Sequence, residues 1–278
     1  MTKVDFHTHT TCSDGILTPE EMINRAYSKG LKYYSITDHD TVSGLDTACE
    51  ISKNLDMTFI PGIELSTNHN NESIHILGFF KDSSYNKNEF IDFVNSLKNQ
   101  RTVRAAKMVQ KLKSEYNINI SFEKVLLRGK DVVARPHIAQ EIIESGYNYS
   151  IQYIFDNLIG KGCKAYVPST KLSTRDGIAF LKRFNALVFL AHPVLIEKSP
   201  LDDFLKMDFD GIEAVYYQNT DAEQDFLVKL AKDNNLLISA GSDFHGNLEN
   251  DKRHGDIGSM SKNYKDEYLE SFIERLNS

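Results

Sequence analysis

The sequence predicts an α/β fold with a mostly parallel sheet, and the order of its apolar segments is the main reason. Short apolar stretches of strand length alternate with stretches of helical periodicity along most of the 278 residues. About seven strands separated by helices favour parallel pairing, because each helix carries the chain back to the same edge of the sheet. With 41% hydrophobic residues, the chain is long enough for one large domain or two small ones.

The first third of the chain begins this alternation. Residues 3–9 predict the first strand. A helix starts next, since Thr18 is a good N-cap, Pro19 suits the first helical position and Glu21 completes a capping box. Another helix is expected over 45–54, and further strands are expected over 32–37, 59–64 and 74–80.

The middle of the chain has a different pattern. A single long helical periodicity covers residues 88–116, and shorter helical segments follow at 121–127, 136–146 and 150–159. The next strand is expected only at 164–167. We therefore expect a single domain of residues 1–278 that carries a helical insertion, or cap, at about 82–165.

Strand and helix alternate again in the last third. A helix over 175–184 begins with Ser173 and Asp176 as a capping pair. The remaining strands are expected at 186–191, 211–216 and 236–241, and the remaining helices at 222–234 and 264–276.

The bulk composition argues against several kinds of partner. A formal charge of −7 disfavours a protein that binds long nucleic acid. A small anionic substrate or a very short oligonucleotide could still bind at a locally positive site. No apolar run approaches the length of a membrane span, and the first residues lack a secretory signal, so we expect a cytoplasmic protein. The widely spaced Cys12, Cys49 and Cys163 fit free thiols in a reducing compartment.

Residue types that bind metals are concentrated at the predicted strands. His7 and His9 lie two residues apart in the first strand and share one face, although such a pair alone equally fits two ordinary polar side chains. His75 lies within a predicted strand, and other ligand-type residues follow or end strands: Asp14, Asp38, His39, Glu64, His192, Asp243 and His245. The C-terminal ends of strands converge on one face of a closed parallel barrel. Because polar strand ends in water explain only one or two of these residues, the whole set predicts a metal site.

The donor atoms indicate which metals would bind. Imidazoles and carboxylates without a thiolate suit Zn²⁺, Mn²⁺ or Fe²⁺ and disfavour iron–sulfur or soft-metal sites. The set is too large for one ion, so two or three ions that share a bridging carboxylate fit better.

The ordered motifs resemble those of the PHP (polymerase and histidinol phosphatase) superfamily. The motifs are His7-Thr8-His9, Thr37-Asp38-His39, Gly62-Ile63-Glu64, His75, Ala191-His192-Pro193 and Ser242-Asp243-Phe244-His245. Each is common alone, but together they occur in the family's order and span most of the chain. The resemblance implies a distorted (β/α)7 TIM-like barrel, the PHP fold, which agrees with the strand count above.

The resemblance also implies three divalent ions, with Mn²⁺ as the first choice and Zn²⁺ or Fe²⁺ as alternatives. The first ion would bind His7, His9, Glu64 and Asp243; the second Glu64, His75 and His192; the third Asp14, His39 and His245. Asp38 and Asp40 would lie behind these ligands. The ions would outweigh the ligand carboxylates, attract phosphate, and acidify water to a hydroxide nucleophile. His192, His245 and Asp243 would take part in catalysis, but a histidine would protonate the leaving group only if it were not fully committed to metal.

The segment Val133-Ala134-Arg135-Pro136-His137 in the insertion provides the substrate hypothesis. Pro136 favours a helix start, where free N–H groups and the Arg135 guanidinium suit an anion. By itself the segment also fits a surface arginine with His137 in solvent. It resembles, however, the family branch that dephosphorylates nucleoside 3′,5′-bisphosphates and trims short RNA from the 5′ end, in which Arg135 and His137 would hold the second phosphate.

Two other functions are kept as alternatives. A histidinol-phosphate phosphatase would share the metal site but needs a pocket for an amino alcohol. A non-catalytic metal-binding module, as found beside DNA polymerases, is disfavoured by the complete ligand set and the acidic charge. Of the remaining basic residues, Arg101 and Arg104 are expected on the surface and His254 in a loop.

Overall fold

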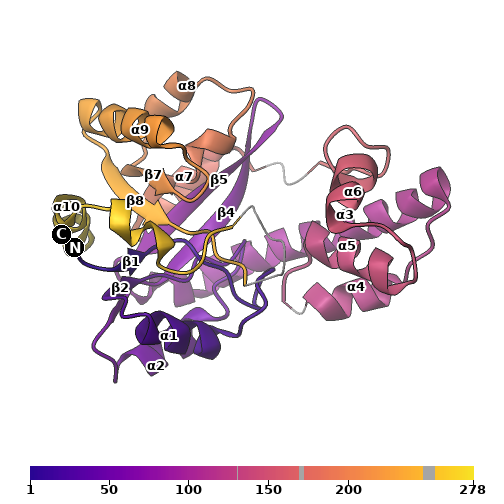
Figure 1. The fold of residues 1–278 in the computed structure, drawn as a ribbon, viewed down its shortest axis with the longest axis horizontal. Coiled ribbons are helices and arrows are strands. Elements are labelled where there is room, and N and C mark those ends of the chain that lie inside the picture. The colour runs from indigo at the N-terminus through magenta and orange to yellow at the C-terminus, as the bar shows by residue number, and fades with distance from the viewer. Residues whose placement is uncertain (130, 169–171, 247–253) are drawn as a thin grey trace.

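The computed structural model describes residues 1–129, 131–168, 172–246 and 254–278, and it contains two β-sheets (Figure 1). A three-stranded parallel sheet has the order β1 (Val4–Asp5), β2 (Tyr33–Tyr34) and β3 (Thr58–Phe59). A five-stranded sheet has the order β4 (Gly62–His69), β5 (Glu72–Phe80), β6 (Ala186–Leu190), β7 (Gly211–Tyr216) and β8 (Leu237–Gly241). The predicted α/β class is therefore confirmed.

The expectation of mostly parallel pairing was wrong for β5, the second strand of the larger sheet. β5 is antiparallel to both β4 and β6, whereas β6, β7 and β8 are parallel. The cause is a two-residue hairpin at Asn70 and Asn71, whose φ values are 49° and 60°. Two consecutive left-handed residues form the turn that matches the twist of a hairpin, and asparagine tolerates that conformation.

The two sheets do not close into the expected barrel within the described residues. They are linked edge to edge by isolated bridges, Thr8 with Phe244 and His39 with Glu64, and by a hydrogen bond of 2.9 Å from the Phe6 N–H to the Ala240 carbonyl. The strand expected at 164–167 is also wrong, because this part of the chain forms turns and irregular backbone. The links nevertheless bring the ends of β1, β2 and β8 together beside β4.

Five of the helices pack against the sheets. They are α1 (Pro19–Ser28), α2 (Leu45–Ser52), α7 (Thr174–Arg183), α9 (Asp221–Asp233) and α10 (Asp266–Leu276). The capping box of Thr18 and Glu21 is present in α1, and the Ser173 hydroxyl caps α7 by accepting the Asp176 N–H. Four short helices were not predicted: α8 (Leu201–Leu205), η1 (Ser83–Asn86), η3 (Pro193–Leu195) and η4 (Ser259–Asn263).

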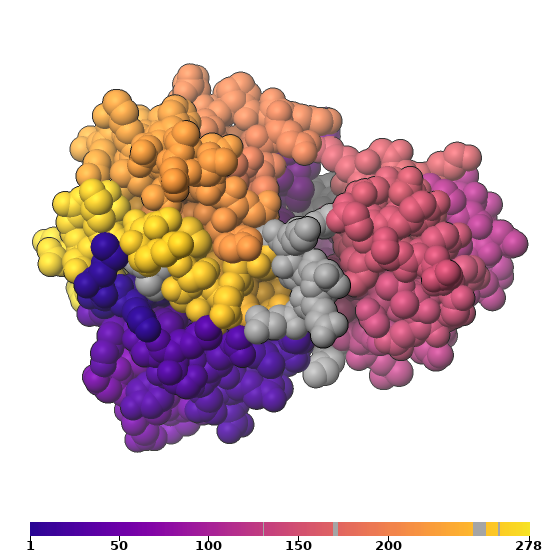
Figure 2. Space-filling view, in the orientation of Figure 1, coloured from indigo at the N-terminus to yellow at the C-terminus, as the bar shows by residue number. Residues whose placement is uncertain are grey.

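The helices within residues 88–159 form a lobe beside the body that carries the sheets (Figure 2). They are α3 (Asn88–Tyr116), α4 (Phe122–Gly129), α5 (Arg135–Glu144), α6 (Ile151–Ile154) and the π-helix η2 (Phe155–Ile159). In the described part of the chain, no helix has both the length and the apolar character that crossing a membrane would need.

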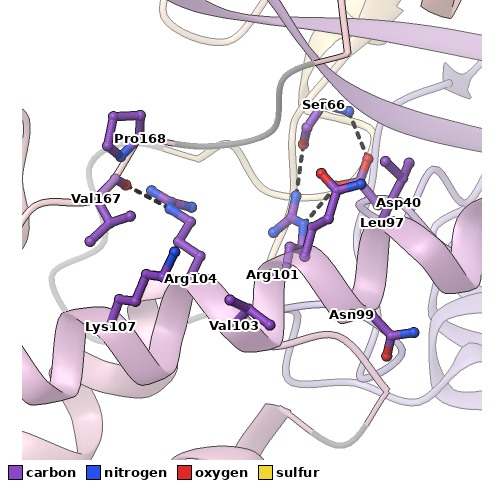
Figure 3. Close-up of a pocket in the computed structure, with 11 residues that line it drawn as sticks. Asp40, Ser66, Leu97, Asn99, Arg101, Val103, Arg104, Lys107, Val167 and Pro168 are labelled. Carbon is purple, nitrogen blue, oxygen red and sulfur yellow. Dashed lines mark hydrogen bonds and ion pairs between the residues drawn. The ribbon is translucent and has the colours of Figure 1, made fainter.

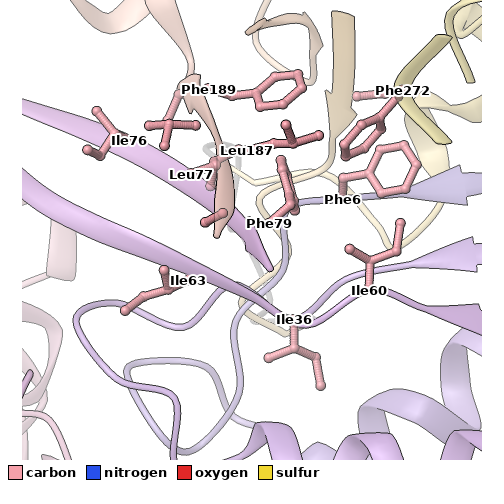
Figure 4. Close-up of a cluster of buried hydrophobic side chains, with 14 of the residues drawn as sticks. Phe6, Ile36, Ile60, Ile63, Ile76, Leu77, Phe79, Leu187, Phe189 and Phe272 are labelled. Atoms are coloured by element: carbon pink, nitrogen blue, oxygen red, sulfur yellow. The ribbon is translucent and has the colours of Figure 1, made fainter. Parts of the chain in front are cut away.

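The molecule has two hydrophobic cores, and α3 contributes to both. In the body, Phe6, Phe79 and Phe272 pack edge to face, with ring centroids 4.9 to 6.2 Å apart (Figure 4). The first half of α3 buries Phe90, Val94 and Leu97 in this core, and its second half buries Ala105, Met108 and Leu112 in the core of the lobe. Residues of α3 between these two faces therefore lie where the body meets the lobe.

Candidate metal centre

Four predicted ligands converge between β1, β4 and β8. His7 and His9 follow β1, Glu64 is the third residue of β4, and Asp243 follows β8. The Nε2 atoms of His7 and His9 lie 3.3 and 3.2 Å from Glu64 Oε2, and 3.4 and 3.1 Å from Asp243 Oδ1. Ligand atoms held at 2.0–2.1 Å by one tetrahedral ion would be about 3.4 Å apart, so this spacing fits a metal ion.

The other carboxylate oxygen of Glu64 faces a second group of histidines. His75 Nδ1 lies 2.8 Å and His192 Nε2 lies 3.0 Å from Glu64 Oε1. His75 was expected within a strand, and it is the fourth residue of β5, which is antiparallel, so it reaches the site from the N-terminal half of that strand. Glu64 therefore stands between two groups of nitrogen donors, as a bridging ligand would.

A third group surrounds Asp14. His245 Nε2 lies 3.2 Å from Asp14 Oδ1, and His39 Nε2 lies 3.9 Å from Asp14 Oδ2. His39 Nδ1 is 2.9 Å from Glu64 Oε2, so this ring lies between the third group and the bridging carboxylate. His9, Asp14, His39 and His245 offer one ligand atom each within 4.8 Å of one another. The structure thus brings together all nine residues that the sequence predicts as ligands.

Buried polar atoms without hydrogen bonds support a metal at this place. Several buried side-chain atoms of the ligand set have no hydrogen-bond partner of acceptable geometry: His7 Nε2, His9 Nε2, Asp14 Oδ1, His39 Nδ1, Glu64 Oε2 and His75 Nδ1. A buried polar atom without a partner costs about 1–3 kcal/mol. Coordination to cations would satisfy all six atoms at once, so the residues present fit divalent metals.

The charges of the cluster shift the pKa values of its members. Burial would lower the pKa of His9, but the adjacent carboxylates of Asp243 and Glu64 outweigh it and raise the pKa to about 10. Burial would raise the pKa of Glu64, but the charges of His39 and His75 hold it well below its usual range. The pKa of His39 falls to about 4, mainly because of burial. The metal-free cluster therefore keeps its carboxylates ionised and protonates part of its histidines.

The backbone has a positive φ at three residues of the site. Asp40, His192 and Asp243 have φ values of 54°, 28° and 54°. Every other non-glycine residue with positive φ in the described chain is an asparagine, which adopts this conformation easily. Strained backbone persists where surrounding contacts impose it, and it is concentrated at functional sites.

Glu213 supports the ligands, and the sequence reading did not identify it. Its Oε1 accepts a hydrogen bond of 3.0 Å from His7 Nδ1, and its Oε2 accepts one of 2.7 Å from the backbone N–H of His192. The proton of His7 then sits on Nδ1, which leaves the Nε2 lone pair for a metal. A side chain at Gly241 would collide with Glu213 and His7, so this close approach requires glycine. The missed signal was a charged residue in the middle of an apolar strand.

Asp38 lies behind the ligands and has hydroxyl partners. It accepts hydrogen bonds from the Thr10 N–H at 2.7 Å, the Thr10 hydroxyl at 2.6 Å and the Ser13 hydroxyl at 2.5 Å. Burial raises the pKa of Asp38 despite these bonds. Because Asp38 orders the loop that leads to Asp14, its contacts agree with a supporting role.

A cavity of about 310 Å³ opens over the ligands and extends to the helical lobe. Arg135 lines it, with its guanidinium 5.6 Å from the centre of the Phe155 ring. His137 lies outside the cavity wall and accepts the backbone N–H of Ala134 through Nδ1 at 3.0 Å. The structure thus places Arg135 in the wall of the same cavity as the predicted metal ligands and shows His137 bonded to the start of α5.

Three residues expected on the surface or in a loop reach this cavity. Arg101 and Arg104 line it from α3, so their expected surface placement was wrong. Burial, together with the charges of Arg135 and Arg101, lowers the pKa of Arg104 to about 10. His254 also lines the cavity, with its ring centroid 4.1 Å from that of His245.

Comparisons with known proteins agree with this geometry. The family model described as PHP domain matches residues 5–275. The 5′-3′ exoribonuclease Rnm of Escherichia coli K12 is 32% identical over 250 residues, covering 87% of this chain and 84% of its own. The 3′,5′-nucleoside bisphosphate phosphatase of Chromobacterium violaceum is 27% identical over 254 residues, covering 88% of each chain. A solved structure from Bifidobacterium adolescentis, described as a metal-dependent phosphoesterase, covers 99% of this chain and 96% of its own at 26% identity, with a TM-score of 0.84.

Proposed function

The chain belongs to the PHP domain family and is a metal-dependent phosphoester hydrolase, and we propose that it removes the 3′-phosphate from nucleoside 3′,5′-bisphosphates. The bisphosphate phosphatase of Chromobacterium violaceum supports this substrate, and the relative named exoribonuclease supports a further activity on short oligoribonucleotides from the 5′ end. Both substrates present a phosphate ester at the 3′ oxygen of a nucleotide that also carries a 5′-phosphate.

We propose that three divalent ions bind the ligand groups, with Mn²⁺ preferred and Zn²⁺ or Fe²⁺ as alternatives. His7, His9, Glu64 and Asp243 would hold the first ion, Glu64 with His75 and His192 the second, and Asp14 with His39 and His245 the third. Bound there, the ions supply Lewis acidity toward the phosphoryl oxygens and lower the pKa of water. The protein orients these ligands through Glu213 and through the carbonyl of Asp243, to which His245 Nδ1 donates at 2.7 Å.

The placement of Arg135 is the observation that carries the substrate proposal. Arg135 and Arg104 line the same cavity as the metal ligands, and their mutual repulsion contributes to the lowered pKa of Arg104. A second phosphate of the substrate would relieve this repulsion and accept charge-assisted hydrogen bonds from a guanidinium fork. A monophosphate bound at the metals would leave these arginines without that partner.

The predicted contact between His137 and phosphate stays a prediction, and the structure adds a positioning role. By accepting the Ala134 N–H, His137 Nδ1 ties the residue before Arg135 to the first turn of α5. The proton of the neutral ring then lies on Nε2, which would be the atom available as a donor.

The test compares phosphate release from adenosine 3′,5′-bisphosphate, adenosine 3′-monophosphate, AMP and histidinol phosphate by Mn²⁺-loaded protein. We expect the bisphosphate to be preferred. Arg135→Ala should lower kcat/KM for the bisphosphate about 10- to 100-fold and hardly affect the 3′-monophosphate. Arg175→Ala, which removes an exposed arginine of α7, is the matched control.

Three results would contradict the proposal. If Arg135→Ala kept the wild-type preference for bisphosphate over 3′-monophosphate, Arg135 would not recognise a second phosphate. If histidinol phosphate were the preferred substrate, the metal centre would serve the alternative phosphatase. Metal binding without hydrolysis of any phosphoester would contradict the enzymatic function itself.

A further inference from the structure

A second cavity, of about 370 Å³, adjoins the metal cavity along α3 (Figure 3). The two cavities share Ser66, Arg101 and Arg104 in their walls. The second cavity also borders Asp40, which follows the predicted ligand His39 in sequence. It therefore begins beside the metal centre and extends away from it along the helix. Nothing in the phosphatase reaction on a bisphosphate requires this space.

The second cavity has a positive lining. Arg101, Arg104 and Lys107 face it from successive turns of α3, and Asp40 is the one acidic residue among the described residues of its wall. Asp40 Oδ2 already accepts a hydrogen bond of 2.6 Å from Arg101 Nε, and Arg104 Nε donates to the Val167 carbonyl at 2.8 Å. The lining therefore carries more positive than negative charge, which favours an anionic occupant.

Other parts of the same wall are apolar or amide-bearing. Val103 and Leu97 come from α3, and Val167 and Pro168 come from the opposite side. Val103 is 54% exposed, so the cavity is open to solvent at that side. Apolar surface beside cationic groups suits a nucleotide, since a base can pack on the former while its phosphate contacts the latter. A free phosphate ion would leave most of this volume unfilled.

We propose that the second cavity is the subsite for the next nucleotide of a short 5′-phosphorylated oligoribonucleotide whose terminal nucleotide occupies the metal cavity. The inference rests on the proposed phosphoesterase function. The bond broken is the same in both substrates, between phosphorus and the terminal nucleotide's O3′. The water oxygen forms the new bond to phosphorus, and O3′ leaves with a proton. A bisphosphate releases inorganic phosphate, whereas an oligonucleotide releases the remaining chain with that phosphate at its new 5′ end.

The shared arginines explain how one site would accept both substrates. In the oligonucleotide, the phosphoryl group also carries the next nucleoside. That nucleoside has to extend from the metal cavity into the neighbouring cavity. Arg101 and Arg104 lie in the wall that the two cavities share. Arg101 donates hydrogen bonds to Asp40 Oδ2 and, at 2.7 Å, to Ser66 Oγ. The released chain again carries a 5′-phosphate, so it is a substrate for the next cycle with that phosphate at Arg135.

The test uses residues that line the second cavity alone. Lys107→Glu should lower kcat/KM for 5′-phosphorylated diadenylate about tenfold and leave the rate on adenosine 3′,5′-bisphosphate unchanged. Val103→Trp, which fills the cavity from its exposed edge, should have the same selective effect. Lys113→Glu is the matched control, since Lys113 is exposed on the same helix and outside both cavities, and it should change neither rate.

The outcomes separate this inference from the proposed function. Equal loss on both substrates in Lys107→Glu and Val103→Trp, or no loss on the diadenylate, would overturn the subsite. If the wild type cleaved the diadenylate with Lys107 dependence but not the bisphosphate, the substrate proposal would fail and the subsite would stand.

Discussion

His254 lies close to two predicted metal ligands, although it does not belong to the predicted ligand set itself. Its ring packs on that of His245, and its Nε2 lies 4.0 Å from Asp243 Oδ2. Asp243, His245 and His254 could together hold an ion, but His254 is the one histidine of this group outside the predicted ligand set, so its ring would remain able to move a proton. We therefore predict that His254 protonates the leaving O3′.

His254→Asn should lower kcat for adenosine 3′,5′-bisphosphate about 100-fold, because O3′ is a poor leaving group without a proton. Hydrolysis of 4-nitrophenyl phosphate, whose leaving group needs no proton, should fall much less. Comparing the two rates in wild type and variant is the measurement. Equal losses on both substrates would instead indicate that His254 binds metal.

The pKa values of the histidines predict that metal binding releases protons. The pKa of His9 is raised to about 10, so its ring is protonated in the metal-free protein at pH 7, whereas a ligand nitrogen has to be unprotonated. Metal affinity should therefore increase with pH, about tenfold per pH unit for each proton released, until the pH reaches the pKa of His9. The pKa of His39 is lowered to about 4, so this ring contributes no proton near neutral pH.

Calorimetric titration with Mn²⁺ at pH 7 in two buffers of different ionisation enthalpy measures this release. Different apparent binding enthalpies are expected, and identical enthalpies would show that the site binds metal without losing protons.

At the scale of elements, Asp131 connects the helical lobe to the body. Its carboxylate accepts hydrogen bonds from Lys98 Nζ at 2.6 and 2.8 Å and from the hydroxyls of Thr41 and Ser43, both at 2.7 Å. Thr41 follows the site loop of His39, and Asp131 precedes α5, which begins at Arg135. Asp131 therefore holds the start of α5 against the loop of the metal ligands and against α3.

Asp131→Ala should raise KM for the bisphosphate about tenfold with a smaller change in kcat, because Arg135 would lose its fixed position. KM for adenosine 3′-monophosphate, which lacks the second phosphate, should stay the same. Asp56→Ala removes an exposed carboxylate paired with Lys32 and is the control. A kcat decrease of the same size on both substrates would place the effect of Asp131 at the metals instead.

Elements whose signals are local were predicted well. The capping box of Thr18 and Glu21 and the cap at Ser173 involve residues three positions apart, so they operate wherever the helix packs. The Asn70–Asn71 turn is equally local, yet the hairpin that it forms was not predicted, because the flanking apolar strands also fit parallel pairing. Direction of pairing depends on which partner a strand meets, and periodicity does not encode the partner.

At the scale of the whole molecule, the metal centre joins segments from both ends of the chain. His7 is separated from Asp243 by most of the sequence, while the lobe keeps its own core of residues such as Met108, Ile138 and Ile142. Ions that bind only the folded site stabilise it by mass action, by about 2.7 kcal/mol at 100 times the Kd. Metal binding should therefore raise the free energy of unfolding mainly for the body, which contains the ligands.

Removing the metal with a chelator should speed amide hydrogen exchange in the site segments 7–14, 39–41 and 242–245. Exchange in α4 and α5 should change little, since their packing does not involve the ligands. Hydrogen exchange measured by mass spectrometry with and without Mn²⁺ provides the comparison. A uniform change across body and lobe would mean that the two cores unfold as one unit.

The sequence by itself determined the α/β class, the order of most helices and strands, and the identity of the histidines and carboxylates that meet at the metal centre. These follow from local physical chemistry, since caps, periodicity and the types of donor atom can be read along the chain. The tertiary structure decided the antiparallel β5, the open arrangement of the two sheets, and the positions of Glu213, Arg104 and His254 beside the predicted ligands. Each of these depends on contacts between residues far apart in sequence, whose energies exist only once the chain has folded.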